Sequence, residues 1–87
     1  LGGHGVGHSV HELPFIPNFG KIGKGEKLEE GIVLAIEPLF NVGSEAVKVA
    51  KDNFTWVTVD RSRSAHFELT VAVGKDGPDI LTPRIKL

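Results

Sequence analysis

The stretch IVLAIEP, residues 32–38, is a short apolar run that ends in a carboxylate and a proline. Its branched side chains and the stop at Pro38 predict a buried β-strand over its first five residues. Strand alternation places Glu37 on the same face as Val33 and Ala35, whose small side chains leave space beside the carboxylate. An unpaired carboxylate is costly to bury, so Glu37 is either solvated at an exposed strand end or a ligand for a cation.

A second candidate carboxylate lies in SAHFELTVAV, residues 64–73. Strict alternation from residue 66 predicts a strand with one fully apolar face and one face that carries His66, Glu68 and Thr70. If this strand is central in a sheet, Glu68 projects into an interior layer and needs a cation beside it. If the strand lies at an edge, Glu68 is an ordinary solvated residue.

The candidate histidines lie in the glycine-rich stretch GGHGVGHSVHELP, residues 2–14. Prolines at 14 and 17 exclude a helix here and predict loop and extended chain. His11 is the candidate metal ligand, since neutral imidazole is the commonest histidine role at a metal, and a surface loop histidine is the alternative. His4 is assigned to packing or to the support of other ligands before ligation itself.

The rest of the chain carries weaker patterns. Residues 20–31 read as a polar connector, residues 43–53 as a weak helical turn or an excursion, and residues 54–59 as a strand. Residues 75–78 predict a turn, and residues 80–82 a last short strand.

Composition limits the classes of function. A length of 87 residues predicts one domain. A formal net charge of −1 argues against a nucleic-acid partner, and the absence of cysteine excludes disulfides and thiolate metal sites. No apolar run approaches the roughly 20 residues of a membrane span, so we expect neither nucleic acid nor membrane as a partner.

Three motifs, taken in order, resemble a known family. Gly-His-Gly-Val-Gly before His-Glu-x-Pro, then Ile-Glu-Pro, then Ser-Ala-x-Phe-Glu are similar to the C-terminal half of the type I methionine aminopeptidases, over nearly the whole chain. The resemblance implies an α+β pita-bread fold of two halves around a dinuclear metal, with residues 1–87 as a single partial domain. It also implies a cytoplasmic hydrolase that removes N-terminal methionine from peptides and proteins.

The resemblance also implies a set of site residues. The metal ligands are expected to be His11, Glu37 and Glu68, and the metals to be two divalent ions of Co, Mn, Fe or Zn. Trp56 is implied near the substrate pocket, although its spacing alone favours a buried core tryptophan. Asn18 stands where some members place a substrate-contacting histidine, so a substrate contact is expected there.

Several features leave other functions open. The two aspartates that the family takes from its first half have no counterpart here, so we expect the chain to be inactive alone. It should then need the missing N-terminal half, or self-associate through exposed apolar surface. His8, His66 and Leu69 depart from the family's usual arginine, glutamine and histidine. The alternatives are a noncatalytic binding module on the same scaffold and a proline-directed peptidase relative, although residues 39–43 fit the methionine branch better.

Overall fold

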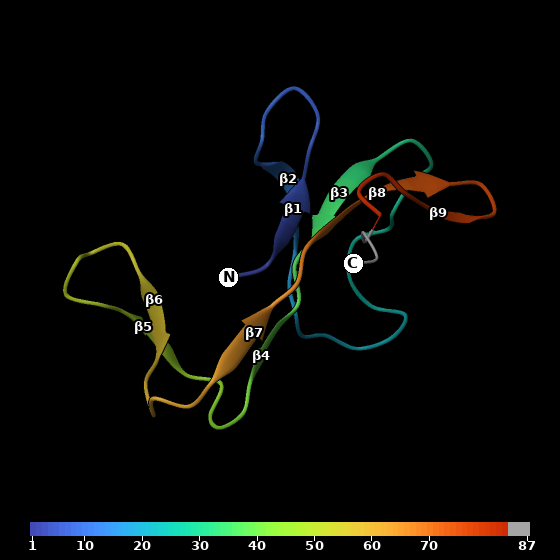
Figure 1. The fold of residues 1–87 in the computed structure, drawn as a ribbon. Helices are drawn as coiled ribbons and strands as arrows, with labels where there is room; N and C mark the ends of the chain where they lie inside the picture. Colours follow the sequence, from blue (N-terminus) through green and yellow to red (C-terminus); the bar gives the residue numbers. More distant parts are fainter. Residues whose placement is uncertain (84–87) are drawn as a thin grey trace.

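The structure, a computed structural model that describes residues 1–83, is built from short β-strands joined by turns and loops (Figure 1). No helix occurs within these 83 residues. The strands are β1 (Gly3–Gly5), β2 (Glu12–Ile16), β3 (Val33–Ile36), β4 (Leu39–Asn41), β5 (Val47–Val49), β6 (Trp56–Thr58), β7 (Ser64–His66), β8 (Leu69–Gly74) and β9 (Gly77–Ile80).

The strands form three antiparallel sheets. The largest has the order β2-β1-β3-β8-β9, and the other two are the pairs β4-β7 and β5-β6. Figure 1 shows them in a row, with the five-stranded sheet at one end and the β5-β6 pair at the other.

One long hairpin runs through all three sheets. Its pairing starts with Val33 opposite Ala72 in β3-β8, continues with Leu39 opposite His66 in β4-β7, and reaches Val49 opposite Trp56 in β5-β6. Both strands advance by the same number of residues over this whole length, so the register never shifts. Backbone hydrogen bonds between the sheets, from Phe67 N to Pro38 O at 3.1 Å and from Val42 N to Arg63 O at 2.8 Å, keep the same register.

The hairpin bends where its ladders are interrupted. The first interruption lies at residues 37–38 and 67–68, beside Pro38, which has no N–H to donate to a ladder. The second lies between β4-β7 and β5-β6, where Asp60 joins the two arms. Its carboxylate accepts hydrogen bonds from Ser44 N at 2.7 Å and from Ser62 N at 3.0 Å.

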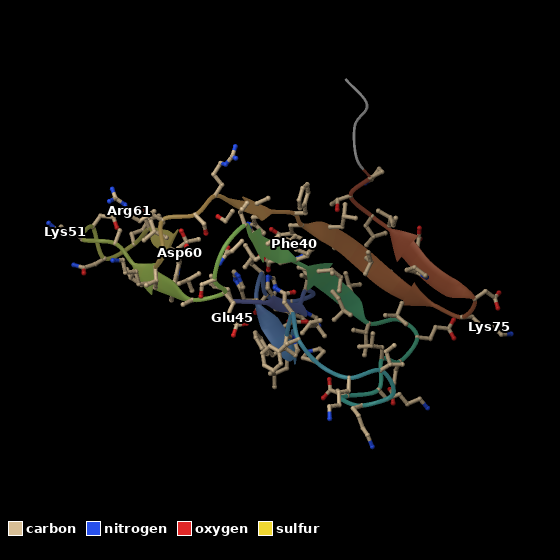
Figure 2. The ribbon with its side chains drawn as sticks, turned by 90° about the horizontal axis from the view of Figure 1, so that it is seen from below. Phe40, Glu45, Lys51, Asp60, Arg61 and Lys75 are labelled. Carbon is tan, nitrogen blue, oxygen red and sulfur yellow. The ribbon has the colours of Figure 1, made fainter. Side chains whose placement is uncertain are left out.

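Little apolar surface is enclosed within the described residues. Only Leu34 and Ala35, both in the central strand β3, are buried hydrophobic residues there. The radius of gyration is 15.0 Å, whereas a compact chain of this length would have about 12 Å. Figure 2 shows the same elongation from below, with Lys51 near one end and Lys75 near the other. The sheets therefore present uncovered faces.

The exposed side chains include many large hydrophobic residues. They are spread over the loops and all three sheets, and they include Leu13, Phe15, Phe19, Ile22, Phe40, Val42, Phe54 and Trp56.

Several sequence predictions are confirmed. The strand expected at 32–36 is β3, the strand expected within 54–59 contains β6, and residues 20–31 contain neither helix nor strand.

No helix in the described part of the chain has the length and apolar character to cross a membrane.

Three sequence predictions are wrong in detail. Of the two alternatives for residues 43–53, a weak helical turn or an excursion, the helical turn is wrong, because the segment contains β5 and belongs to the outgoing arm of the long hairpin. The strand expected from residue 66 is divided into β7 and β8 by the interruption at residues 67–68. The last strand within residues 1–83 is β9, which begins inside the predicted turn at Gly77 and ends at Ile80, not at residue 82.

Asp60 should make the hairpin sensitive to acid. The Ser62 hydroxyl, the Ser44 N–H and the Ser62 N–H lower the pKa of Asp60 from 3.8 to about 2. Because the folded pKa lies below the unfolded one, the stabilisation is complete above the unfolded value and is lost as the pH falls through the folded value. Between about pH 4 and pH 2, we expect the thermal midpoint of the Asp60→Asn variant to fall less than that of the unmodified chain, because the variant lacks the carboxylate that becomes protonated.

The measurement is the thermal midpoint by circular dichroism across this pH range. Asp76→Asn, in the turn between β8 and β9, is the control for removing one acidic group. If Asp60→Asn and the unmodified chain show parallel pH profiles, Asp60 does not hold the two arms together in solution.

Candidate metal centre

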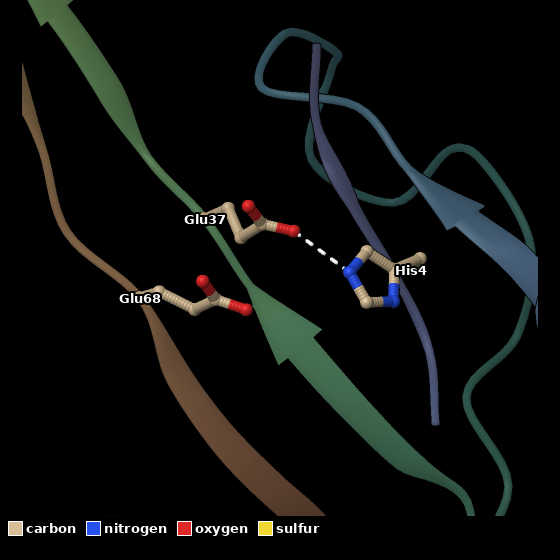
Figure 3. Close-up of side chains that lie close together, drawn as sticks. All are labelled: His4, Glu37 and Glu68. Atoms are coloured by element: carbon tan, nitrogen blue, oxygen red, sulfur yellow. Dashed lines mark ion pairs between the residues drawn. The ribbon is translucent and has the colours of Figure 1, made fainter. Parts of the chain in front are cut away.

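The first interruption of the hairpin brings two glutamates face to face. Ile36 pairs with Leu69 on one side of the gap, and Leu39 pairs with His66 on the other. With the register unchanged, Glu37 stands opposite Glu68. Residues opposite one another in an antiparallel pair point to the same face, so the two carboxylates emerge together where the ladder is open (Figure 3).

The third member of the group is His4, on the neighbouring strand β1. His4 pairs with Ala35, which lies two residues before Glu37 and therefore on the same face. The ligand atoms of His4, Glu37 and Glu68 all lie within 4.8 Å of one another. Figure 3 shows the three side chains converging from three neighbouring segments. The His4 and Glu37 side chains are largely shielded, at 13% and 17% exposure, and Glu68 is exposed.

Two glycines let β1 come close enough to place His4. A Cβ added to Gly3 would overlap the Ala35 carbonyl oxygen, and one added to Gly5 would overlap the Leu13 carbonyl oxygen. Both glycines are buried between β2 and β3. Their lack of a side chain therefore sets the distance from His4 to Glu37.

The hydrogen bonds of the His4 ring determine which nitrogen is available. Nδ1 lies 3.0 Å from the Gly5 carbonyl oxygen, which can only accept, so Nδ1 donates its proton. In the neutral ring, Nε2 then presents a lone pair, and it lies 2.9 Å from Glu37 Oε2, another acceptor. These two atoms repel one another unless a proton or a metal ion lies between them.

The same geometry is that of a metal-binding histidine. Histidines that ligate a metal through one nitrogen generally donate the other N–H to a carbonyl or carboxylate. In His4 the Gly5 carbonyl takes this second role, and Nε2 faces Glu37 Oε2 at 2.9 Å.

His11, the histidine expected from the sequence to be the ligand, is not a member of this group. It lies in the loop before β2 and is exposed. Its ring packs on that of His4, with the centroids 4.1 Å apart and the planes tilted by 39°. The structure thus brings His4, and not His11, to the two glutamates, because His4 is in a strand hydrogen-bonded to β3.

Asn18, expected from the resemblance to contact substrate, and His66, expected to hydrogen-bond beside the metal, both contact Glu37. The Asn18 side-chain amide donates to the Glu37 carbonyl oxygen at 2.9 Å. His66 Nε2 lies 3.2 Å from Glu37 Oε1. The contact of His66 with Glu37 follows from the pairing of His66 with Leu39, which puts His66 on the face of Glu37. The sequence alone does not reveal this register.

A cleft of about 780 Å³ opens beside the group. Its lining combines polar and apolar side chains and includes His4, His11, Leu13, Phe15, Glu37, Leu39, Trp56 and His66. Trp56 is 52% exposed, so within the described residues it is not the buried core tryptophan that its spacing favoured. Asn18 lines an adjoining cleft of about 350 Å³, which Leu39 and Trp56 also border.

Comparison with known proteins gives consistent matches. The model of metallopeptidase family M24 matches residues 1–75. The methionine aminopeptidase of Clostridium perfringens is 56% identical over 80 residues, which are 92% of this chain and 32% of that protein. Methionine aminopeptidase 1 of Bacillus subtilis is 55% identical over 80 residues, which are again 92% of this chain and 32% of that protein.

A solved structure agrees with these matches. The crystal structure of the Thermotoga maritima methionine aminopeptidase superposes with a TM-score of 0.91 at 49% identity, covering 95% of this chain and 33% of that one. The chain therefore spans about a third of the length of the relatives it matches.

The close approach of β1 gives a test of this geometry. Gly3→Ala puts a methyl group against the Ala35 carbonyl, so β1 must move away from β3. We expect a loss of about 1–3 kcal/mol in the free energy of unfolding, as for other overpacked positions. Gly7→Ala is the matched control, because the nearest obstacle there, at 2.5 Å, is the flexible end of the Glu12 side chain.

The measurement is urea unfolding followed by circular dichroism. Equal unfolding free energies for the Gly3→Ala and Gly7→Ala chains would show that β1 does not pack this tightly against β3.

Proposed function

Since the chain belongs to metallopeptidase family M24, a family of divalent-metal enzymes, we propose that it carries one half of the metal centre of a methionine aminopeptidase. The observation that supports this most directly is the convergence of His4, Glu37 and Glu68, with the lone pair of His4 Nε2 directed at the Glu37 carboxylate. In this proposal His4 takes the place that the sequence assigned to His11.

The donor set fits hard or borderline divalent cations. One imidazole and two carboxylates suit Mn, Fe, Co or Zn, and the absence of thiolates removes any preference for softer metals. We propose two such ions in the complete site. Bound there, they would lower the pKa of a water molecule and polarise the carbonyl of the scissile peptide bond.

The residues around the group have separate tasks in this proposal. Glu37 and Glu68 supply the negative charge that holds the ions, and the His4 ring is oriented by the Gly5 carbonyl and by packing on His11. His11 is then free to contact the bound peptide from the wall of the cleft.

The apolar part of the cleft suits the substrate side chain. Trp56 and Leu39 border it close to the group. An unbranched apolar side chain such as that of methionine can lie against them while the peptide N-terminus approaches the carboxylates. Asn18 donates to Glu37 and lines the adjoining cleft, and in this proposal it contacts the substrate from there.

The chain supplies only part of the complete protein in this proposal. Three ligands are too few for two ions, and the exposed hydrophobic residues need a cover. We propose that the part of the relatives' length that the chain does not match supplies further carboxylates, the helices of an α+β pita-bread fold and the cover for these faces. The complete enzyme would act on N-termini of proteins in the cytoplasm.

Metal binding by the chain tests the ligand assignment. We expect it to bind Mn²⁺ and His4→Ala or Glu68→Ala to weaken binding at least about tenfold, because each removes one of three protein ligands. His8→Ala is the matched control, since His8 is exposed and outside the group. Isothermal titration calorimetry measures the affinities.

Two results would contradict the assignment. One is undiminished binding by the His4→Ala chain together with a loss in His11→Ala, which would restore His11 as the ligand. The other is no metal binding at all, which would favour a noncatalytic module on the same scaffold.

Activity tests the division of the site between two parts. The chain alone, supplied with Mn²⁺ or Co²⁺, should not release methionine from a methionyl peptide, because it lacks the carboxylates needed to bridge two ions. Co-expression with the unmatched part of the Clostridium perfringens relative should restore turnover. It should also reduce the binding of a hydrophobic dye, because the uncovered faces become buried.

The control is the same co-expression with the Glu68→Ala chain, which should remain inactive. Steady turnover by the 87-residue chain alone would show that a complete site forms without the other part.

A further inference from the structure

Glu37 contacts other residues through both carboxylate oxygens and through its main-chain carbonyl. Its Oε2 faces His4 at 2.9 Å, its Oε1 lies 3.2 Å from His66 Nε2, and its carbonyl oxygen accepts the Asn18 amide at 2.9 Å. The three partners come from β1, from β7 and from the loop after β2. Glu68, in contrast, is exposed.

The position of Glu37 explains why it needs such contacts. Glu37 lies in the interruption of the ladder, next to Pro38, and belongs to neither β3 nor β4. Regular strand pairing therefore does not fix its position. The Asn18 side-chain amide donates a hydrogen bond to the main-chain carbonyl of Glu37. This bond also ties the segment after β2 to the end of β3.

His66 acts on the side chain instead of the backbone. The register places it opposite Leu39 and therefore on the face of Glu37 and Glu68. Its Nε2 faces Oε1, while Oε2 is the oxygen next to His4. When His66 Nε2–H donates to Oε1 of Glu37, the other oxygen, Oε2, remains available to a cation beside His4.

We propose that His66 and Asn18 are positioning residues for Glu37: His66 fixes the orientation of its carboxylate, and Asn18 fixes its backbone. The proposal rests on the proposed function, because its consequence is the affinity of the metal group. Neither residue is assigned as a ligand.

Cobalt(II) is the probe, because its visible absorption reports the arrangement of its ligands. We expect His66→Ala to weaken Co²⁺ binding by about tenfold or more, the usual scale for groups that orient a ligand, and to change the absorption spectrum. His66→Gln retains an N–H donor and should restore the spectrum and most of the affinity. Asn18→Ala should also weaken binding.

Each variant has a matched control. Asn41→Ala removes an amide that donates to a main-chain carbonyl, that of Ser44 at 3.0 Å, but at the other bend of the hairpin. His8→Ala removes an exposed histidine outside the group. Both should bind Co²⁺ as the unmodified chain does. The thermal midpoint of His66→Ala without metal should match that of His8→Ala, because the His66 side chain is 48% exposed.

A second measurement needs no metal. Side-chain couplings and nuclear Overhauser effects of Glu37 by NMR should show one rotamer in the unmodified and His66→Gln chains, and averaging in His66→Ala. Absence of Co²⁺ binding to the unmodified chain, with this rotamer pattern intact, would overturn the proposed metal function and leave the positioning role supported. An averaged Glu37 in the unmodified chain, or a His66→Ala chain with unchanged affinity and spectrum, would overturn the positioning role.

Discussion

The unshifted register of the hairpin from Val33 to Ala72 is the constraint on which the rest of the structure depends. A shift of one residue in an antiparallel pair would turn every side chain of one arm to the other face. Glu37 and Glu68 would then lie on opposite sides, and no cation could reach both. The same register also sets where His66 and Asp60 stand, so the site and the distal bend are consequences of one pairing.

The interruption of the ladder at residues 37–38 and 67–68 leaves the paired glutamates, Glu37 and Glu68, outside the regular strands. In a continuous sheet, both glutamates would lie among close neighbours on a crowded face. Here the ladder opens beside Pro38, and the two carboxylates project from this opening toward His4. Strand β1, in which His4 lies between Gly3 and Gly5, adds one imidazole to the two carboxylates. Loss of regular pairing leaves Glu37 dependent on side chains for support, which Asn18 and His66 provide.

The sequence allowed part of this to be predicted, for reasons that differ from residue to residue. Glu37 and Glu68 could be recognised because each is a carboxylate in an apolar, alternating stretch, where a charge needs a partner. His4 could not be chosen over His11 in the same way, since both lie in one glycine-rich segment. Only the pairing of His4 with Ala35 separates them, and pairing between strands is not a local property of the sequence. For the same reason residues 43–53 could be predicted only as a weak helical turn or an excursion, although their strand β5 pairs with β6 in a hairpin.

The group formed by His4, Glu37 and Glu68 is positioned by strands of this chain alone. His4, Glu37 and Glu68 are brought together by β1, β3 and β8, which are hydrogen-bonded neighbours around the buried residues Leu34 and Ala35. The apolar faces, by contrast, remain uncovered. A partner segment that docks on those faces would therefore meet a half-site whose geometry is already set, and would lose less conformational entropy than if it had to order both halves. This favours an arrangement in which the chain holds a first cation weakly and the added carboxylates complete the site.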